Sequence, residues 1–381
     1  MLSFAAVVIA APAAEAVPAT IPLTITNNSG QSGPVYIYNL GTFLATGQQG
    51  WVDGAGTFHP WPGGGDPPVP APDASIPGPA AGQSTTIQVP KMSGRIYFSY
   101  GSKLVFRLAP GGLVQPAVQN PSDPNRDILF NWSEYTLNDD GIWINSTQVD
   151  MYSVPYAVGV RRADGSTAET GHLKPGGYSA VYAGLRAQPG GWGGLIQTRG
   201  DGTVLRALAP GYGIETGALP ASVMGDFVDR VWARYRSATL TVTPFGDRPD
   251  VRYTGRVEGE TFVFRNTSGG VATTFVKPDS DSVLRCYKHL DAPNDEVRGP
   301  ISRTLCACFN RSTLLVNASQ PDPDAGAFYA DAVTNHFSRI IHAQMVDGKA
   351  YGFPFDDVGH HESLVHDGNP QSASLILDPL S

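Results

Sequence analysis

Short runs of β-branched and aromatic residues, bounded by Gly, Pro and Ser, recur through the first 210 residues. Such runs are typical of strands. They predict strands at 21–27, 33–40, 84–89, 94–101, 103–109, 127–137, 142–154, 156–162, 176–185, 193–199 and 202–210. In the run PVYIYNL both alternating faces are largely apolar or aromatic, so this strand is expected to be covered on both sides. The close spacing of the strands favours a β-sandwich or barrel for residues 17–210.

The period of the pattern changes near residue 211. Apolar residues recur every four positions within 219–238 and predict a helix, with Ser222 as its N-cap. A longer helix is predicted from Asp324 to Gly348. Predicted strands and one short helix lie between these two segments, at 238–245, 251–257, 261–266 and 301–312. We therefore expect a mixed α/β domain at 211–349.

The final apolar run, SASLILDP, predicts a strand that rejoins the β domain. Residues 350–381 would then complete that domain, and the mixed α/β domain would be an insertion between β elements. A wide groove is expected where the two domains meet.

Residues 60–79 contain eight prolines and fit neither a strand nor a helix. This long loop has polyproline character, and Trp51 and Trp61 lie on it or near it. Two interpretations stay open. The loop is either a tolerated insertion or an aromatic rim beside a cleft.

The bulk composition narrows the possible partners. The 381 residues carry a net charge of −8, and the 26 basic residues are scattered. This argues against nucleic acid, whose binding depends largely on clustered Lys and Arg. Residues 1–16 resemble a secretory signal peptide, and no other segment has the length of a membrane span. We expect a secreted protein that binds a neutral polymer or a small molecule.

Secretion is compatible with six N-x-S/T sequons and three cysteines. The sequons predict a glycoprotein, although those within the 127–154 strand pair are expected to stay bare; they are Asn27, Asn131, Asn145, Asn266, Asn310 and Asn317. Cys286 could pair with Cys306 or with Cys308, and the spacing does not decide between them. No set of Cys or His residues has an established metal-ligand spacing, including the His-rich segment 360–366.

Glu134 and Asp150 lie sixteen positions apart in two adjacent predicted strands. A loop centred near Ile142 would place the two acids opposite each other, whereas a tight turn at Asp139-Asp140 would move them well apart. The sequence does not decide between these registers. Because side chains alternate along a strand, Glu134 shares a face with Thr136 and Asn138, but Trp143 and Asp150 differ in parity. A bend between Trp143 and Asp150 is therefore needed for both to meet one ligand.

This polar face is either an ordinary solvated face of an antiparallel sheet or a carbohydrate site. Thr, Asn and carboxylate groups hydrogen-bond sugar hydroxyls, and Trp packs on sugar C–H faces. Two acids that flank a glycosidic bond can hydrolyse it, one by protonating the leaving oxygen and the other by activating water.

Two segments, NWSEYTLNDDGIWINSTQVDMYSVP and YGFPFDDVGHHESLVHDGNP, resemble the laminaripentaose-producing β-1,3-glucanases of glycoside hydrolase family 64. That family belongs to the thaumatin-like superfamily, and the resemblance extends over roughly residues 20–381. It implies a mainly β fold, with a thaumatin-like β-barrel or sandwich domain and a mixed α/β domain around a wide groove. It also implies Glu134 as general acid, Asp150 as general base, and Thr136, Asn138 and Trp143 as sugar-contacting residues.

The resemblance further implies an endo-acting enzyme that inverts anomeric configuration, releases mainly the pentasaccharide and needs no metal or cofactor. The expected partner is β-1,3-glucan, such as laminarin, curdlan or cell-wall glucan, and we expect a monomer with an acidic pH optimum. The alternative function is a thaumatin-like protein that binds β-glucan without cutting it. Asp356 and Asp357 either line the acidic cleft that is common in the superfamily or cap a loop.

Overall fold

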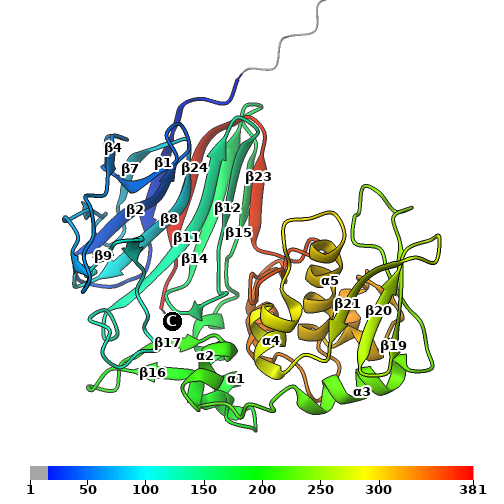
Figure 1. The fold of residues 1–381 in the computed structure, drawn as a ribbon. Helices are drawn as coiled ribbons and strands as arrows, with labels where there is room; N and C mark the ends of the chain where they lie inside the picture. The colour runs from blue at the N-terminus through cyan, green and yellow to red at the C-terminus, as the bar shows by residue number, and fades with distance from the viewer. Residues whose placement is uncertain (1–15, 381) are drawn as a thin grey trace, which may run out of the picture.

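The computed structural model describes residues 16–380, and the remainder of the predicted signal segment lies outside the described residues. Two stacked β-sheets form one side of the molecule, and a helix-rich block with its own sheet forms the other (Figure 1). Within residues 16–380, no helix is both long and apolar enough to cross a membrane. The predicted domain boundaries at 210 and 349 stay predictions.

The first sheet has five strands in the order β15-β14-β24-β1-β7. Its strands are β1 (Thr20–Asn27), β7 (Ser84–Pro90), β14 (Tyr156–Arg162), β15 (Thr167–Thr170) and β24 (Pro370–Leu377). The predicted C-terminal strand is confirmed as β24, which lies between β1 and β14 and runs parallel to β1. It appears in red among the blue and green strands of Figure 1.

The second sheet follows the order β23-β12-β11-β8-β2-β3-β4, with β6 paired to β2. Its strands are β2 (Val35–Phe43), β3 (Gln48–Val52), β4 (Phe58–Pro60), β6 (Ile76–Pro77), β8 (Met92–Tyr100), β11 (Leu129–Asn138), β12 (Gly141–Asn145) and β23 (Leu364–Asp367). As predicted, β2 is covered on both sides. Ile37 packs in the core between the two sheets, and Tyr38 packs in a separate cluster on the opposite face. Alternating apolar side chains from both sheets fill the inter-sheet core, as expected of a sandwich.

The Pro-rich segment 60–79 forms a loop with two very short strands. One of them, β5 (Val69–Pro70), joins β9 (Arg107–Ala109) and β10 (Gly112–Val114) in a small sheet. The strand predicted at 103–109 is therefore shorter than expected. The main chain at Val105 instead exchanges hydrogen bonds with the side chain of Asn125.

Below the sandwich lies a layer made of a three-stranded sheet and several helices. Its elements are β13 (Met151–Tyr152), β16 (Ile196–Thr198), β17 (Val204–Leu208), α1 (Gly177–Ala187), η1 (Trp192–Leu195), α2 (Pro210–Glu215) and α6 (His336–Gln344). The strand predicted at 176–185 is wrong, because this segment forms α1. Val181, Tyr182 and Leu185 recur at helical spacing and are buried against α6.

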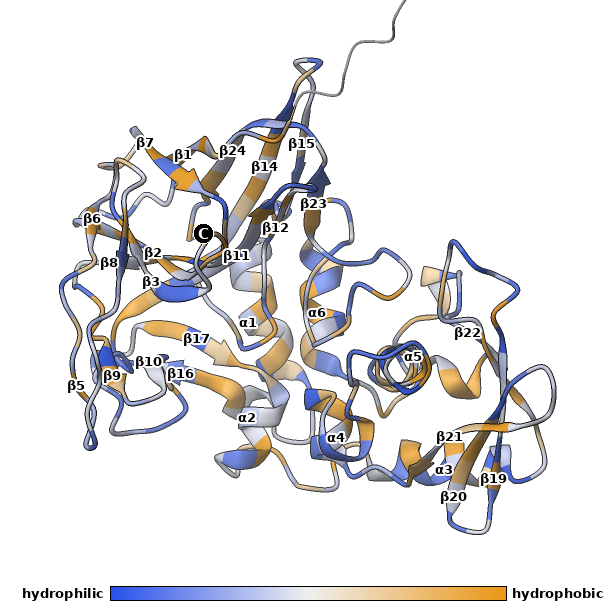
Figure 2. Ribbon diagram, turned by 45° about the horizontal axis from the view of Figure 1, so that its top comes forward, coloured by the Kyte–Doolittle hydropathy of each residue, from blue (hydrophilic) through white to orange (hydrophobic). Residues whose placement is uncertain are grey.

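The helix-rich block surrounds the sheet β21-β20-β19-β18-β22. Its elements are α3 (Gly225–Tyr235), β18 (Leu240–Val242), β19 (Tyr253–Glu258), β20 (Thr261–Arg265), β21 (Val271–Val276), α4 (Ser280–Arg285), η2 (Lys288–Leu290), α5 (Arg298–Asn310), η3 (Thr313–Leu315), β22 (Ser319–Gln320) and η4 (Ala325–Ala327). Buried apolar residues of α3 and β19–β21 pack in one cluster, and these elements lie side by side in Figure 2. Cys286 pairs with Cys306, and Cys308 is free and buried.

The long helix predicted at 324–348 is wrong. The helix α6 begins only at His336, because Asn335 caps it by accepting a hydrogen bond from the Ser338 amide. Upstream, Asp331 is bound to both terminal nitrogens of Arg230, which holds the chain in an irregular path. Ser222 is likewise no N-cap, since α3 starts after Met224.

Candidate active site

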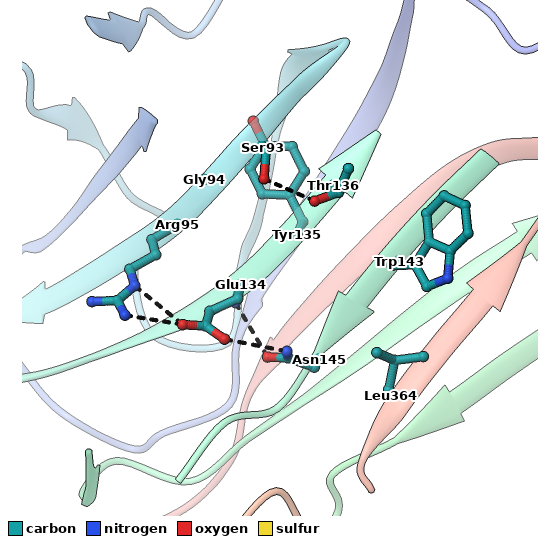
Figure 3. Close-up of a pocket in the computed structure, with 9 residues that line it drawn as sticks. All are labelled: Ser93, Gly94, Arg95, Glu134, Tyr135, Thr136, Trp143, Asn145 and Leu364. Carbon is teal, nitrogen blue, oxygen red and sulfur yellow. Dashed lines mark hydrogen bonds and ion pairs between the residues drawn. The ribbon is translucent and has the colours of Figure 1, made fainter. Parts of the chain in front are cut away.

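Glu134 lies in the middle of the second sheet, between two strands that complete its surroundings. Its β11 position is opposite Arg95 of β8 on one side and Asn145 of β12 on the other. Two residues further along β11, Thr136 is opposite Ser93 and Trp143 in the same way. Cross-strand neighbours share a face, so these side chains line one hollow (Figure 3).

Arg95 holds the two candidate acids together. Its Nε and Nη2 atoms lie 3.2 and 3.0 Å from Oε1 of Glu134, and Nη2 lies 3.7 Å from Oδ2 of Asp150. Oε1 of Glu134 and Oδ2 of Asp150 are therefore at most about 7 Å apart, close enough for both groups to reach one small ligand. The guanidinium also lies 4.8 Å from the ring centre of Trp132.

The β11–β12 hairpin has the tight turn, with Asn138 paired to Gly141. This is the second of the two registers that the sequence left open, and strand pairing alone would place Glu134 and Asp150 well apart. The chain instead leaves the sheet after Asn145, because Ser146 and Gln148 hydrogen-bond to the C-terminal segment. This excursion supplies the expected bend and returns Asp150 to Arg95.

Tyr212 of α2 fixes the other side of Asp150. Its hydroxyl donates a hydrogen bond to Oδ1 of Asp150 over 3.1 Å. Burial and the neighbouring carboxylate raise the pKa of Tyr212 to about 12, so the phenol keeps the proton that it donates. The guanidinium of Arg285 stacks 4.6 Å from the Tyr212 ring, which joins α4 to this side of the site.

Two of the three predicted sugar-contacting residues line the hollow with Glu134. The hydroxyls of Thr136 and Ser93 share a hydrogen bond. The Trp143 ring stacks on the His366 ring of β23, with the ring centres 4.2 Å apart. Asn138 lies further along, at the hairpin turn, where its side chain accepts a hydrogen bond from the Asp140 amide. Its predicted role in sugar binding is untested.

Three hollows lie around Arg95 and its partner Asp150. The hollow at Glu134 has a volume of about 360 Å³, and a second of about 350 Å³ begins at the same Gly94 and Arg95 and extends toward Trp61. A third, of about 280 Å³, is lined by Asp150, Tyr212 and Arg285 and lies where the β elements meet α4. All three are open at the surface rather than enclosed.

Asp356 and Asp357, the two acids whose role the sequence left open, lie in different surroundings. Asp356 is fully buried, and its carboxylate binds Arg311, His342 and the backbone amide of Gly352. Of the two roles that the sequence left open, cleft lining and loop capping, Asp356 therefore has the second. Asp357 is exposed next to it. Residues 16–380 contain no group of three or more His, Cys, Asp or Glu side chains arranged to hold a metal.

The structure adds site residues that the sequence interpretation missed. Arg95 and Asn145 both contact Glu134, and Tyr212 contacts Asp150. The signal for Arg95 was a lone cation within an otherwise apolar and aromatic run. Asn145 belongs to a sequon, but its side chain is buried and bound to Glu134, so this asparagine is unsuited to carry a glycan.

Comparison with known proteins identifies the fold and the chemistry. The family model described as β-1,3-glucanase, that of glycoside hydrolase family 64, matches residues 19–377. The chain belongs to glycoside hydrolase family 64. A glucan endo-1,3-β-glucosidase of Arthrobacter sp. (strain YCWD3) is 58% identical to this family member over 382 residues, covering 100% of this chain and 69% of that protein.

Solved structures agree with this family. A laminaripentaose-producing β-1,3-glucanase in complex with laminaritetraose is 70% identical, with a TM-score of 0.94, and the match covers 96% of this chain and 100% of that one. A β-1,3-glucanase domain from Clostridium beijerinckii is 27% identical, with a TM-score of 0.79, over 94% of this chain and 98% of that domain. The mainly β fold class and the assignment as a glycoside hydrolase are thereby confirmed, and the non-catalytic alternative is not favoured.

Proposed function

We propose that this chain is a secreted, endo-acting β-1,3-glucanase that inverts anomeric configuration and releases short laminari-oligosaccharides, mainly the pentasaccharide. Glu134 is the general acid and Asp150 the general base. Thr136, Asn138 and Trp143 bind the sugar chain. The observation that carries the proposal is the pair of carboxylates held by the one guanidinium of Arg95, on an open surface with Trp143 beside it.

The position of this pair supports the two roles. Both carboxylates lie against one guanidinium at an open surface, so both can approach one glycosidic bond. In the proposed reaction, Glu134 protonates the departing glycosidic oxygen, while Asp150 takes a proton from the water that attacks the anomeric carbon from the opposite face.

Inversion requires space for that water between the acids. Inverting pairs stand about 6.5–9.5 Å apart and retaining pairs about 5–5.5 Å. The upper limit of about 7 Å set by Arg95 includes both ranges, so inversion is proposed from the family resemblance. The anomer of the first product decides the question directly.

The test is digestion of laminarin by wild type, Glu134→Gln and Asp140→Asn, with NMR of the first product. Asp140 is the matched control, because it is an exposed carboxylate in the adjacent hairpin turn. We expect α-anomeric oligosaccharides from wild type and Asp140→Asn, and a rate lower by roughly 100- to 10,000-fold for Glu134→Gln. β-Anomeric products would refute inversion, and an active Glu134→Gln variant would refute the acid assignment.

A further inference from the structure

Three aromatic rings are stacked at the far end of the second sheet, away from Trp143. The Trp51 ring lies between His59 and Trp61, with ring centres 5.1 Å from His59 and 4.7 Å from Trp61. Nε2 of His59 lies 3.0 Å from Oδ2 of Asp53, which fixes the His59 ring at the base of the stack. The stack therefore holds Trp61, the ring at its end, in one orientation.

The strand register connects this stack to the acids. Leu40 of β2 is opposite both Arg95 of β8 and Trp51 of β3, so the cross-strand row that contains Glu134 and Arg95 ends at the stack. Trp61 is tied to the same strand, because its amide donates a hydrogen bond to the Gln49 carbonyl over 3.0 Å. Trp143 and Trp61 thus flank the acids at opposite ends of one sheet face, several strand spacings of about 4.8 Å apart.

The hollow between Arg95 and Trp61 suits a sugar chain. It has a volume of about 350 Å³, and Trp61 forms an aromatic wall while Thr42, Gln49 and Gln115 offer polar side chains. Gln115 accepts a hydrogen bond from Tyr97, and the Tyr97 hydroxyl lies 3.4 Å from Nη1 of Arg95. Polar groups and one rigid aromatic face are the combination expected of a site for a neutral, hydroxyl-rich ligand.

We propose that Trp61, supported by Trp51, is a second glucosyl-binding platform for β-1,3-glucan, on the opposite side of Arg95 from Trp143. The Pro-rich loop then has a function, which is to carry Trp61 to the end of the groove. The proposal rests on the proposed glucanase function, and it adds that long chains contact both ends of the sheet while short ones need not.

The experiment measures the binding of laminarin and of laminaritetraose by calorimetry in the Glu134→Gln background, with and without Trp61→Ala. Val69→Ala is the matched control, since Val69 is an exposed residue of the same loop outside the hollow. We expect Trp61→Ala to weaken laminarin binding roughly tenfold, to affect laminaritetraose less, and Val69→Ala to change neither.

Trp61→Leu is a second variant that keeps apolar packing on Trp51 without an aromatic face, and thermal melts check that each variant folds. Equal laminarin affinity in folded Trp61→Leu and Val69→Ala proteins would overturn the platform. If Glu134→Gln still digests laminarin, the proposed function fails separately. Depletion of wild type and Trp61→Ala by insoluble curdlan at low temperature then still tests the platform.

Discussion

Replacing Arg95 by methionine removes the cation that Glu134 and Asp150 share. Methionine keeps a long apolar side chain near the Trp132 ring, so the change is mainly one of charge. In wild type the guanidinium attracts both carboxylates and holds them on one side of the hollow. In the variant neither side chain is held by this cation.

The size of the effect follows from the distances. Unit charges about 4 Å apart attract by about 4 kcal/mol at an effective dielectric constant of about 20. The side chains of Glu134 and Asp150 are 36% and 30% exposed, so solvent reduces the loss to about 1–1.5 kcal/mol. If that free energy is lost from the transition state, kcat/KM for laminarin should fall by roughly tenfold.

The assay is kcat/KM for reducing-end release from laminarin by wild type, Arg95→Met and Arg95→Lys. Lysine keeps the charge and should lose less activity than methionine. Arg107→Met, which removes an exposed arginine of β9, controls for the change in net charge. A kcat/KM for Arg95→Met within about twofold of the wild-type value would contradict the argument that Arg95 holds the pair in place.

Three further predictions concern the surroundings of the site. Tyr212→Phe removes the hydrogen bond to Asp150 and should lower kcat/KM roughly tenfold with little change in melting temperature; an unchanged kcat/KM would exclude a positioning role. Asp356→Asn leaves the buried Arg311 without its counter-charge and should cost about 3 kcal/mol or more in urea unfolding, and a loss below about 1 kcal/mol would contradict this. Burial and Arg311 lower the pKa of His361 to about 4. The unfolded chain therefore takes up this proton first, and stability should fall between about pH 6.5 and 4. His361→Gln should flatten that part of the melting curve against pH, whereas an identical slope in both proteins would refute the assignment.

The strands were predictable because their pattern is local. Burial alternates along β1, β24 and the second half of β11. It does not alternate along β2 and β8, whose largely apolar runs are covered on both faces. A strand was wrongly predicted at 176–185 because its Tyr and Val residues are common in strands. The spacing of its buried residues by three and four positions, which packs them against α6, identifies the segment as a helix.

The failure at 324–348 has a different cause. The apolar residues there do recur at helical spacing, but Asp331 and Asn335 form competing hydrogen bonds with Arg230 and with the backbone. A side chain from α3 thus decides the conformation of a segment about a hundred residues away. The hydrophobic pattern of the segment does not reveal that Arg230 binds it.

The site shows the same division between local and distant causes. Glu134, Thr136 and Trp143 share a face because of the β11–β12 hairpin, so their grouping could be anticipated. The position of Asp150 could not, because it depends on where the chain leaves the sheet and on Tyr212 from α2.

Glu134 and Asp150 are held by different parts of the fold. Glu134, the proposed acid, is held by a continuous sheet, in which Arg95 and Asn145 approach it from neighbouring strands. Asp150, the proposed base, also contacts Arg95, but its other carboxylate oxygen is bound by Tyr212, a residue of a separate layer that is itself packed under Arg285 of α4. A small shift of α2 relative to the sandwich should therefore move Asp150 while leaving Glu134 in place, and so change the space between the two carboxylates. The distance between the two carboxylates, on which the stereochemical outcome depends, is thus controlled by the contact between layers rather than by the sheet alone.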